Sequence, residues 1–318
     1  MVILLKVVMF LVDLVLPLCG GYALASLWRV DSRLLDRVMT WAIRGVMPPL
    51  ALLSLWKASV SWQLAWLPVL GVGMQVVAGS VGYVRAKQKP HGALGSGSYL
   101  LATLLSNRGI LGALAVFILL GEEAYGYSRL VVLLAAPMLF GVYYPIAKWF
   151  RLNYEAGEEE SVSFLSAIFQ WNQVPVLGVA AGLALNLLDV PRPEYLGTVF
   201  SALVHLAAWA FLVPVGAAMD FGEMRDHWRH VIDILPVKFV LTPLVIGMAG
   251  WAVGLQGTAL YVVVLLSASP TAINAVVTAK IFDLNHHVAA AAFVLTTEFY
   301  LAVIFPLLLV LWGLGGVG

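Results

Sequence analysis

The chain has 318 residues, of which 62% are hydrophobic and 11% are charged, and its net charge is +1. A soluble domain carries about 25% charged residues, so the composition excludes an ordinary soluble domain. The small net charge argues against a nucleic-acid partner. The apolar runs are continuous rather than alternating and the mean hydropathy is +0.94. We therefore expect an all-α membrane protein, because helices satisfy their own backbone polar groups inside a bilayer.

Apolar runs bounded by charged residues, Gly or Pro predict about ten transmembrane helices, since a helix needs roughly 20 apolar residues to cross the hydrocarbon. The longest charge-free stretch runs from Phe239 to Ala279 and is long enough for two spans. The ten predicted spans are Ile3–Trp28, Leu35–Trp56, Ala65–Val84, Ser98–Leu120, Leu130–Phe150, Val174–Leu188, Tyr195–Met219, Val231–Val253, Thr258–Ile281 and His287–Leu311.

Basic residues in the short loops predict the orientation of the chain. Loops on one side hold eleven of them, namely Arg29, Arg33, Arg37, Arg85, Lys87, Lys89, Lys148, Arg151, Arg225, Arg229 and Lys280. The other side holds four, namely Lys6, Lys57, Arg129 and Arg192. We expect the first side to be cytoplasmic, and an even number of spans then places both termini outside the cytoplasm.

Weak internal similarity predicts two halves of opposite topology. The segments Pro17-Leu-Cys-Gly20 and Pro175-Val-Leu-Gly178 are each followed by an aspartate, Asp31 or Asp189, and all of these matches fall at one constant offset. An odd number of spans in each half inverts the second half relative to the first. The predicted division is an inverted repeat of spans one to five at 1–154, a cytoplasmic linker at 155–162, and an inverted repeat of spans six to ten at 163–318.

Spans four and nine each carry a polar break. Span four contains Ser106-Asn107-Arg108-Gly109, and Gly109 and Gly112 weaken the helix there. Span nine contains Ser269-Pro270-Thr271, and Pro270 lacks the N–H that a helix needs. Two broken helices at matching depths are typical of a transporter site, where the N-termini of half-helices favour an anion. The alternative is a pair of kinks that only aid packing.

Two ionisable residues in the predicted spans need a partner or a function, because a charge near mid-bilayer costs at least ~2.5 kcal/mol. Arg108 could hold a substrate carboxylate or form an ion pair with Glu298 in span ten. Glu298 could carry a coupling proton or simply neutralise Arg108. We favour the ion pair.

Other polar residues have simpler interpretations. We expect His205 to make a hydrogen bond rather than carry protons, Asp13 to be solvated at the interface, and Arg44 and Lys238 to reach water from span ends. The adjacent His286-His287 lacks the spacing of a metal site. We therefore expect no metal, no cofactor and no catalytic residue.

Several motifs resemble the auxin efflux carrier family, which includes bacterial malate and malonate permeases and plant PIN-type exporters. They are Ser106-Asn-Arg-Gly-Ile-Leu-Gly112 followed by Gly121-Glu-Glu123, the segment from Asn172 to Asn186, and Ser269-Pro-Thr-Ala-Ile-Asn-Ala-Val-Val-Thr-Ala-Lys280. The resemblance extends along nearly the whole chain. One departure is Ala113, where the family has a proline.

The resemblance implies the elevator fold of sodium–proton antiporters and bile-acid symporters. Spans 1, 2, 6 and 7 would form a scaffold, while spans 3–5 and 8–10 form a transport domain with spans four and nine crossing at its centre. It also implies that asparagines beside the crossing, Asn107 and Asn274, contact a carboxylate, and that a homodimer forms through the scaffold.

We therefore expect a secondary transporter of a small organic anion in the cell inner membrane, driven by protons or sodium, and not an enzyme. The predicted binding residues are Asn107, Arg108, Gly109, Ser269, Pro270, Thr271 and Asn274. A sodium-coupled symporter of the bile-acid type is the main alternative. An intramembrane enzyme using Glu122-Glu123 is disfavoured because the metal-ligand set is missing.

Overall fold

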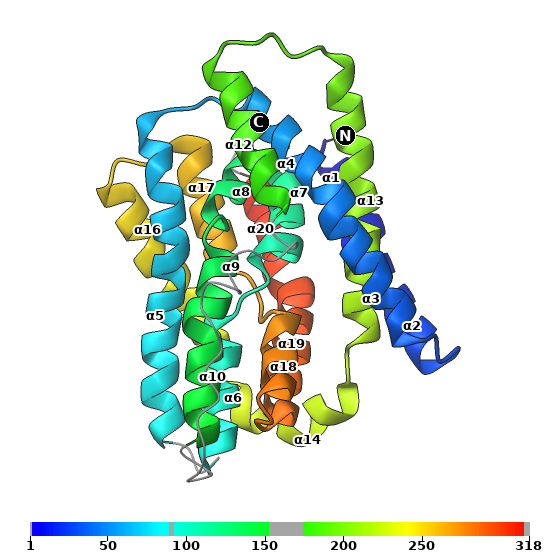
Figure 1. Ribbon diagram of the computed structural model, residues 1–318, viewed down its shortest axis with the longest axis vertical. Helices are drawn as coiled ribbons and strands as arrows, with labels where there is room; N and C mark the ends of the chain where they lie inside the picture. The colour runs from blue at the N-terminus through cyan, green and yellow to red at the C-terminus, as the bar shows by residue number, and fades with distance from the viewer. Residues whose placement is uncertain (1, 89–91, 153–173, 315–318) are drawn as a thin grey trace.

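The computed structural model describes residues 2–88, 92–152 and 174–314, so the linker predicted at 155–162 lies outside the described residues. The described residues are almost wholly helical, and the only β contact among them is one isolated bridge (Figure 1).

The helices of the first half include α-helices and short π-helical or 3-10 turns. In chain order they are α1 (Val2–Phe10), η1 (Leu11–Val15), α2 (Leu16–Ser26), α3 (Ser32–Trp41), η2 (Ala42–Val46), α4 (Met47–Lys57), η3 (Trp62–Ala65), α5 (Trp66–Gln88), α6 (Gly92–Leu104), η4 (Arg108–Gly112), α7 (Ala113–Leu120), α8 (Glu122–Val131), α9 (Ala135–Met138), η5 (Leu139–Tyr143) and α10 (Tyr144–Leu152).

The second half is built in the same way. Its helices are α12 (Val174–Leu187), α13 (Tyr195–Ala217), α14 (Phe221–Val231), α15 (Ile234–Pro236), η7 (Val237–Leu241), α16 (Thr242–Ala252), α17 (Gly257–Ser267), α18 (Ile273–Ile281), α19 (His286–Phe299), η8 (Tyr300–Ile304) and α20 (Phe305–Leu314).

Seven continuous helices among the described residues are long and apolar enough to cross a membrane. Three shorter apolar helices, Arg108–Leu120, Pro175–Leu187 and Gly257–Ser267, fall in predicted spans four, six and nine. The chain is therefore a multi-pass membrane protein, while the count of ten crossings stays a prediction.

Prolines explain most of the π-helical turns. Proline has no N–H for the carbonyl four residues earlier and its ring crowds that carbonyl, so a widened turn before it relieves the clash without ending the helix. In five helices the proline is the second residue of the α-helix that follows the turn: Pro17 after η1, Pro48 after η2, Pro145 after η5, Pro243 after η7 and Pro306 after η8.

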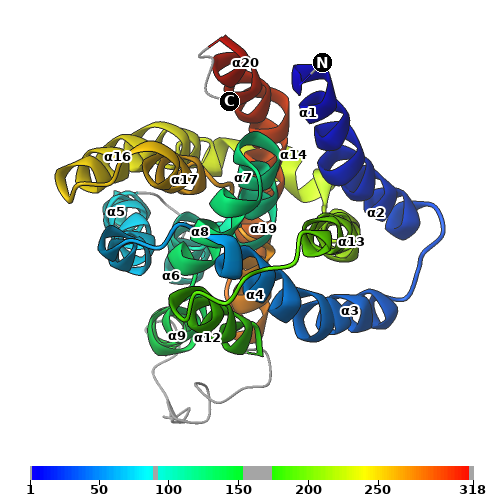
Figure 2. The same ribbon diagram turned by 90° about the horizontal axis from the view of Figure 1, so that it is seen from above.

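Helices of the first half pack against helices of the second half. Viewed from above, α2, α3 and α13 lie on one side of the bundle and α5, α16 and α17 on the other, with α6, α8 and α19 between them (Figure 2). The most extensive contacts among the described helices join α2 with α13 and α4 with α12.

Glycines allow these two pairs to pack closely, since a Cβ added at any of them would collide with backbone of the facing helix. The glycines are Gly21 and Gly216 between α2 and α13, and Gly178 and Gly182 between α4 and α12. Span one thus pairs with seven and span two with six, the reciprocal arrangement that inverted halves would produce. The inverted repeat itself stays a prediction.

Asp13 lies in η1 and is buried, so its predicted solvation at the interface is wrong. Its Oδ2 lies 2.8 Å from His205 Nδ1 on α13. The predicted hydrogen bond of His205 is therefore present, and its partner is the carboxylate of Asp13.

Candidate functional site

The two broken spans meet at their breaks. After α6 ends at Leu104 the chain is extended, and Ser106 forms an antiparallel bridge with Thr271. Asn107 N donates to Pro270 O at 2.7 Å and Ala272 N donates to Leu105 O at 2.9 Å. Each break therefore satisfies the backbone groups that the other leaves free, which a non-helical segment inside a membrane requires.

Side-chain hydrogen bonds and close packing stabilise this crossing. The Asn107 side chain caps η4 by accepting from Leu111 N at 3.3 Å. Thr271 N donates to Thr296 Oγ1 at 2.9 Å, which ties the crossing to α19. Gly112 packs against Ser269, and a Cβ at Gly112 would collide with the Ser269 hydroxyl oxygen.

A cavity of about 360 Å³ lies beside the crossing. Its walls come from α3, η2, α4 and α5, from the chain between Leu105 and Ile110, from α8, α9 and η5, and, in the second half, from α12, α13 and the start of α18. This volume suits a small molecule. No acidic residue is among the described residues that line it.

Arg108 lies in the wall of the cavity with 6% of its surface exposed. Its Nη1 donates to Gly71 O at 2.7 Å and lies 3.5 Å from Met74 Sδ. Within the part of the chain that the structure describes, its Nε and Nη2 have no partner. The guanidinium is therefore anchored on one side and retains donors for a ligand.

Arg129 is a second buried arginine in the same wall, also 6% exposed. Its Nη2 donates to Gly109 O at 2.9 Å, and its guanidinium carbon lies 4.5 Å from the centre of the Tyr125 ring. It has no acidic partner among the described ion pairs. The sequence had suggested an outer loop for Arg129, but α8 already begins at Glu122, which places Arg129 about two helical turns inside the bundle.

Further polar groups in the cavity wall are unsatisfied. The Tyr143 hydroxyl and the Gln75 side-chain oxygen are buried and have no hydrogen-bond partner among the described residues. Buried polar groups normally find a partner, so these two atoms are consistent with a site that a polar ligand completes.

Of the seven predicted binding residues, four line the cavity: Asn107, Arg108, Gly109 and Asn274. The other three, Ser269, Pro270 and Thr271, form the crossing behind the wall and are not among the lining residues.

The predicted ion pair between Arg108 and Glu298 is absent from the described contacts. Glu298 is exposed near the end of α19, whereas the neighbouring Thr296 and Thr297 are buried. The helix therefore turns the two threonines inward and the carboxylate outward, away from Arg108. Lys238 also differs from expectation, since it is buried rather than extended to water.

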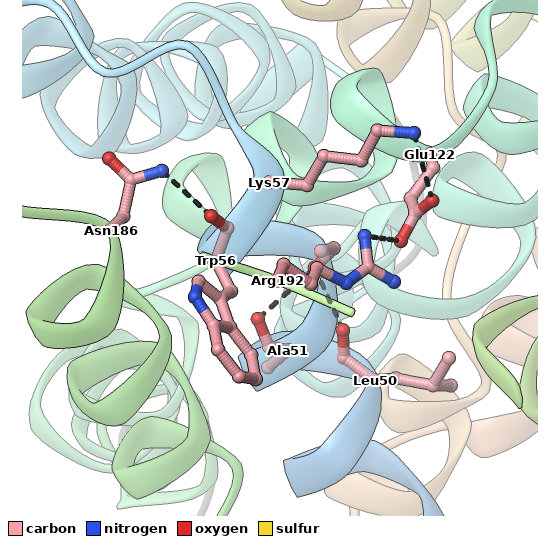
Figure 3. A network of polar contacts seen from close by, with 8 residues as sticks. Leu50, Ala51, Trp56, Lys57, Glu122, Asn186 and Arg192 are labelled. Atoms are coloured by element: carbon pink, nitrogen blue, oxygen red, sulfur yellow. Dashed lines mark hydrogen bonds and ion pairs between the residues drawn. The ribbon is translucent and has the colours of Figure 1, made fainter. Parts of the chain in front are cut away.

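A separate polar network lies where α8 begins and α4 ends, and this end of the bundle is called here the Glu122 end (Figure 3). Glu122, the first residue of α8, lies 2.6 Å from Arg192 Nη1 and 3.6 Å from Lys57 Nζ at the end of α4. The Arg192 and Glu122 side chains are only 9% and 13% exposed. Asn186 of α12 donates to Trp56 O at 3.0 Å, so α4 and α12 are fastened together beside this ion pair.

A second cluster at the same end joins the same elements. Ser59 N donates to Glu123 Oε1 at 3.1 Å, and the Tyr127 hydroxyl donates to Glu123 Oε1 at 2.7 Å. The Glu122 end is thus held by several contacts between α8 and the chain around the end of α4.

A sequence model of the family described as membrane transport protein matches residues 160–310. The matched range contains the break in span nine and the helices α12, α13 and α16–α19. The match confirms the resemblance to the auxin efflux carrier family that the sequence motifs indicated. No curated protein sequence matches the chain.

Proposed function

We propose that this chain, whose residues 160–310 match the membrane transport protein family, is a secondary transporter that binds a small organic anion in the cavity beside the crossing. The observation that carries the proposal is the charge of the cavity wall. Arg108 and Arg129 are both buried there, and no acidic residue is among the described lining residues.

Energetics make a bound anion the natural counter-charge. A buried ion without a partner costs several kcal/mol even after relaxation, so two arginines in one wall strongly favour a ligand of opposite charge. Guanidinium groups bind carboxylates through paired N–H donors. The free donors of Arg108 and the unsatisfied Tyr143 hydroxyl would supply such contacts, which favours a carboxylate.

The transport step would follow the elevator mechanism. The cavity lies between helices of the proposed scaffold (α3, α4, α12 and α13) and the crossing in the proposed transport domain. Movement of the crossing relative to the scaffold would carry a bound anion across the membrane.

The cavity and the Glu122 network support an inward-facing state, in which the binding site is open to the cytoplasm and closed on the outer side. The lining extends from Ala51 and Arg129, about two helical turns from the Glu122 end, to Met39 and Pro175 farther from that end. The ion pair of Glu122 and Arg192 would therefore close the outer side while the site faces the cytoplasm. The orientation and the homodimer rest on the loop charges and the family resemblance.

A ligand screen with purified protein tests the proposal, because a ligand that binds the native state raises the thermal midpoint. We expect saturable stabilisation by at least one carboxylate from a panel of acetate, malonate, succinate and citrate, and none by uncharged sugars of similar size. Stabilisation by a cationic or neutral compound and by no anion would contradict the proposal.

A further inference from the structure

Lys238 is a buried cation that the proposed anion site does not use directly. It lies in η7, its side chain is 1% exposed, and it is not among the residues that line the cavity. Its ammonium nitrogen donates to Ser106 Oγ at 2.7 Å, Thr103 O at 3.0 Å and Leu105 O at 3.4 Å. An ammonium has three N–H donors, so oxygen atoms of one short segment take all of them.

These oxygens mark the C-terminal end of the half-helix α6. The last carbonyls of a helix have no partner within it, and they form the negative end of the helix dipole. Ser106, the next polar residue, lines the cavity. Without a compensating cation, this negative end would repel an anion in the cavity.

In transporters with broken helices, carbonyls of the unwound segment and the C-terminal ends of half-helices coordinate coupling sodium ions. The three oxygens around Lys238 are ligands of the same kind at the same type of position. The ammonium group therefore lies where a monovalent cation would otherwise be needed.

We propose that Lys238 is a tethered cation that takes the place of a coupling sodium ion at the end of α6, so that the anion binds without a metal cation from solution. This proposal rests on the proposed function. Lys238 is a positioning residue, because it acts through Ser106 and the end of α6 and does not touch the ligand.

A purely structural role makes a different prediction. Lysine side chains can stabilise a helix by bonding its last carbonyls, and loss of such a cap would lower stability whatever cation is present. A tethered cation can instead be replaced by a free one. In Lys238→Ala, the vacated space beside the three oxygens would accept sodium or methylammonium.

The test measures anion affinity by thermal shift at constant ionic strength in choline, sodium, lithium or methylammonium chloride, with the carboxylate that stabilises the wild type best. Wild-type affinity should be the same in choline and in sodium. Lys238→Ala should lose about tenfold or more in affinity in choline and regain it in sodium or methylammonium. Lys280→Ala, which removes an exposed lysine at the end of α18, is the matched control and should behave as the wild type.

Three results would overturn the proposal: sodium-dependent binding by the wild type, full affinity of Lys238→Ala in choline, or lost affinity that no small cation restores. The wild-type comparison needs no variant, so it remains decisive if Lys238→Ala does not fold. If no anion stabilises the wild type in any of these salts, the proposed function fails instead.

Discussion

The ion pair at the Glu122 end gives the sharpest prediction about the transport cycle. If Glu122 and Arg192 hold the outer side closed, Glu122→Gln should open it. The substitution removes the charge of the side chain and keeps its size. A change in the open fraction is then caused by loss of the ion pair and not by an empty space left at position 122.

The magnitude follows from burial. The two side chains are 2.6 Å apart and 9% and 13% exposed, so solvent screens the pair only slightly. Close pairs of opposite charges that are shielded from solvent contribute about 1.5 kcal/mol or more. Loss of the ion pair should therefore raise the ratio of open to closed molecules by about tenfold or more.

The assay is labelling of a cysteine beneath the network. Ala51 lines the cavity and lies in α4 about two helical turns before Lys57, which contacts Glu122. In a Cys19→Ser background, Ala51→Cys should react slowly with a membrane-impermeant thiol reagent added to the outer side, and Glu122→Gln should accelerate the reaction by about tenfold or more.

Lys57→Ala is the matched control. Lys57 is 59% exposed and 3.6 Å from Glu122, and an exposed pair contributes only about 0–1 kcal/mol, so labelling should change less than about fivefold. Unchanged labelling in folded Glu122→Gln, or an equal effect of Lys57→Ala, would refute the closing role of the buried pair.

Three other predictions test separate parts of the structure. Gly112→Ala should lower stability by about 1–3 kcal/mol through overpacking against Ser269, and adding Ser269→Ala should restore part of it in a double-mutant cycle; additive losses would argue against the contact. His205→Ala should lower the thermal midpoint more than Asp13→Ala, because it leaves a buried carboxylate without a partner whereas the imidazole is partly exposed; the reverse order would contradict the pairing. Glu298→Gln should leave anion affinity and the pH dependence of transport unchanged, since Glu298 is exposed and outside the cavity wall; loss of the pH dependence would restore its role as a proton carrier.

Hydrophobicity and the positions of Gly and Pro predicted much of this architecture. The breaks at Asn107–Gly109 and Ser269–Thr271 follow from residues that cannot continue a helix. That they pair through backbone hydrogen bonds could not be predicted, because the bonds join residues far apart in the sequence.

The burial of individual charged residues could not be predicted from the sequence. Arg129 and Lys238 lie near the ends of apolar runs, which is also where exposed residues occur, so their burial depends on which helix covers them. For Glu298 the prediction was wrong in the opposite direction. Its place in an apolar run suggested burial, but the phase of α19 turns Thr296 and Thr297 inward and leaves the carboxylate exposed.

The central claim is that the buried arginines of the cavity bind an organic anion, and calorimetric titration of the best-stabilising carboxylate tests it most directly. The titrated proteins are the wild type, Arg108→Ala, Arg129→Ala and the control Arg44→Ala, since Arg44 is exposed and outside the cavity wall. Each cavity variant should bind about 10- to 150-fold more weakly, as expected for loss of charged hydrogen bonds, and Arg44→Ala should match the wild type. Wild-type affinity in both folded cavity variants would contradict the account.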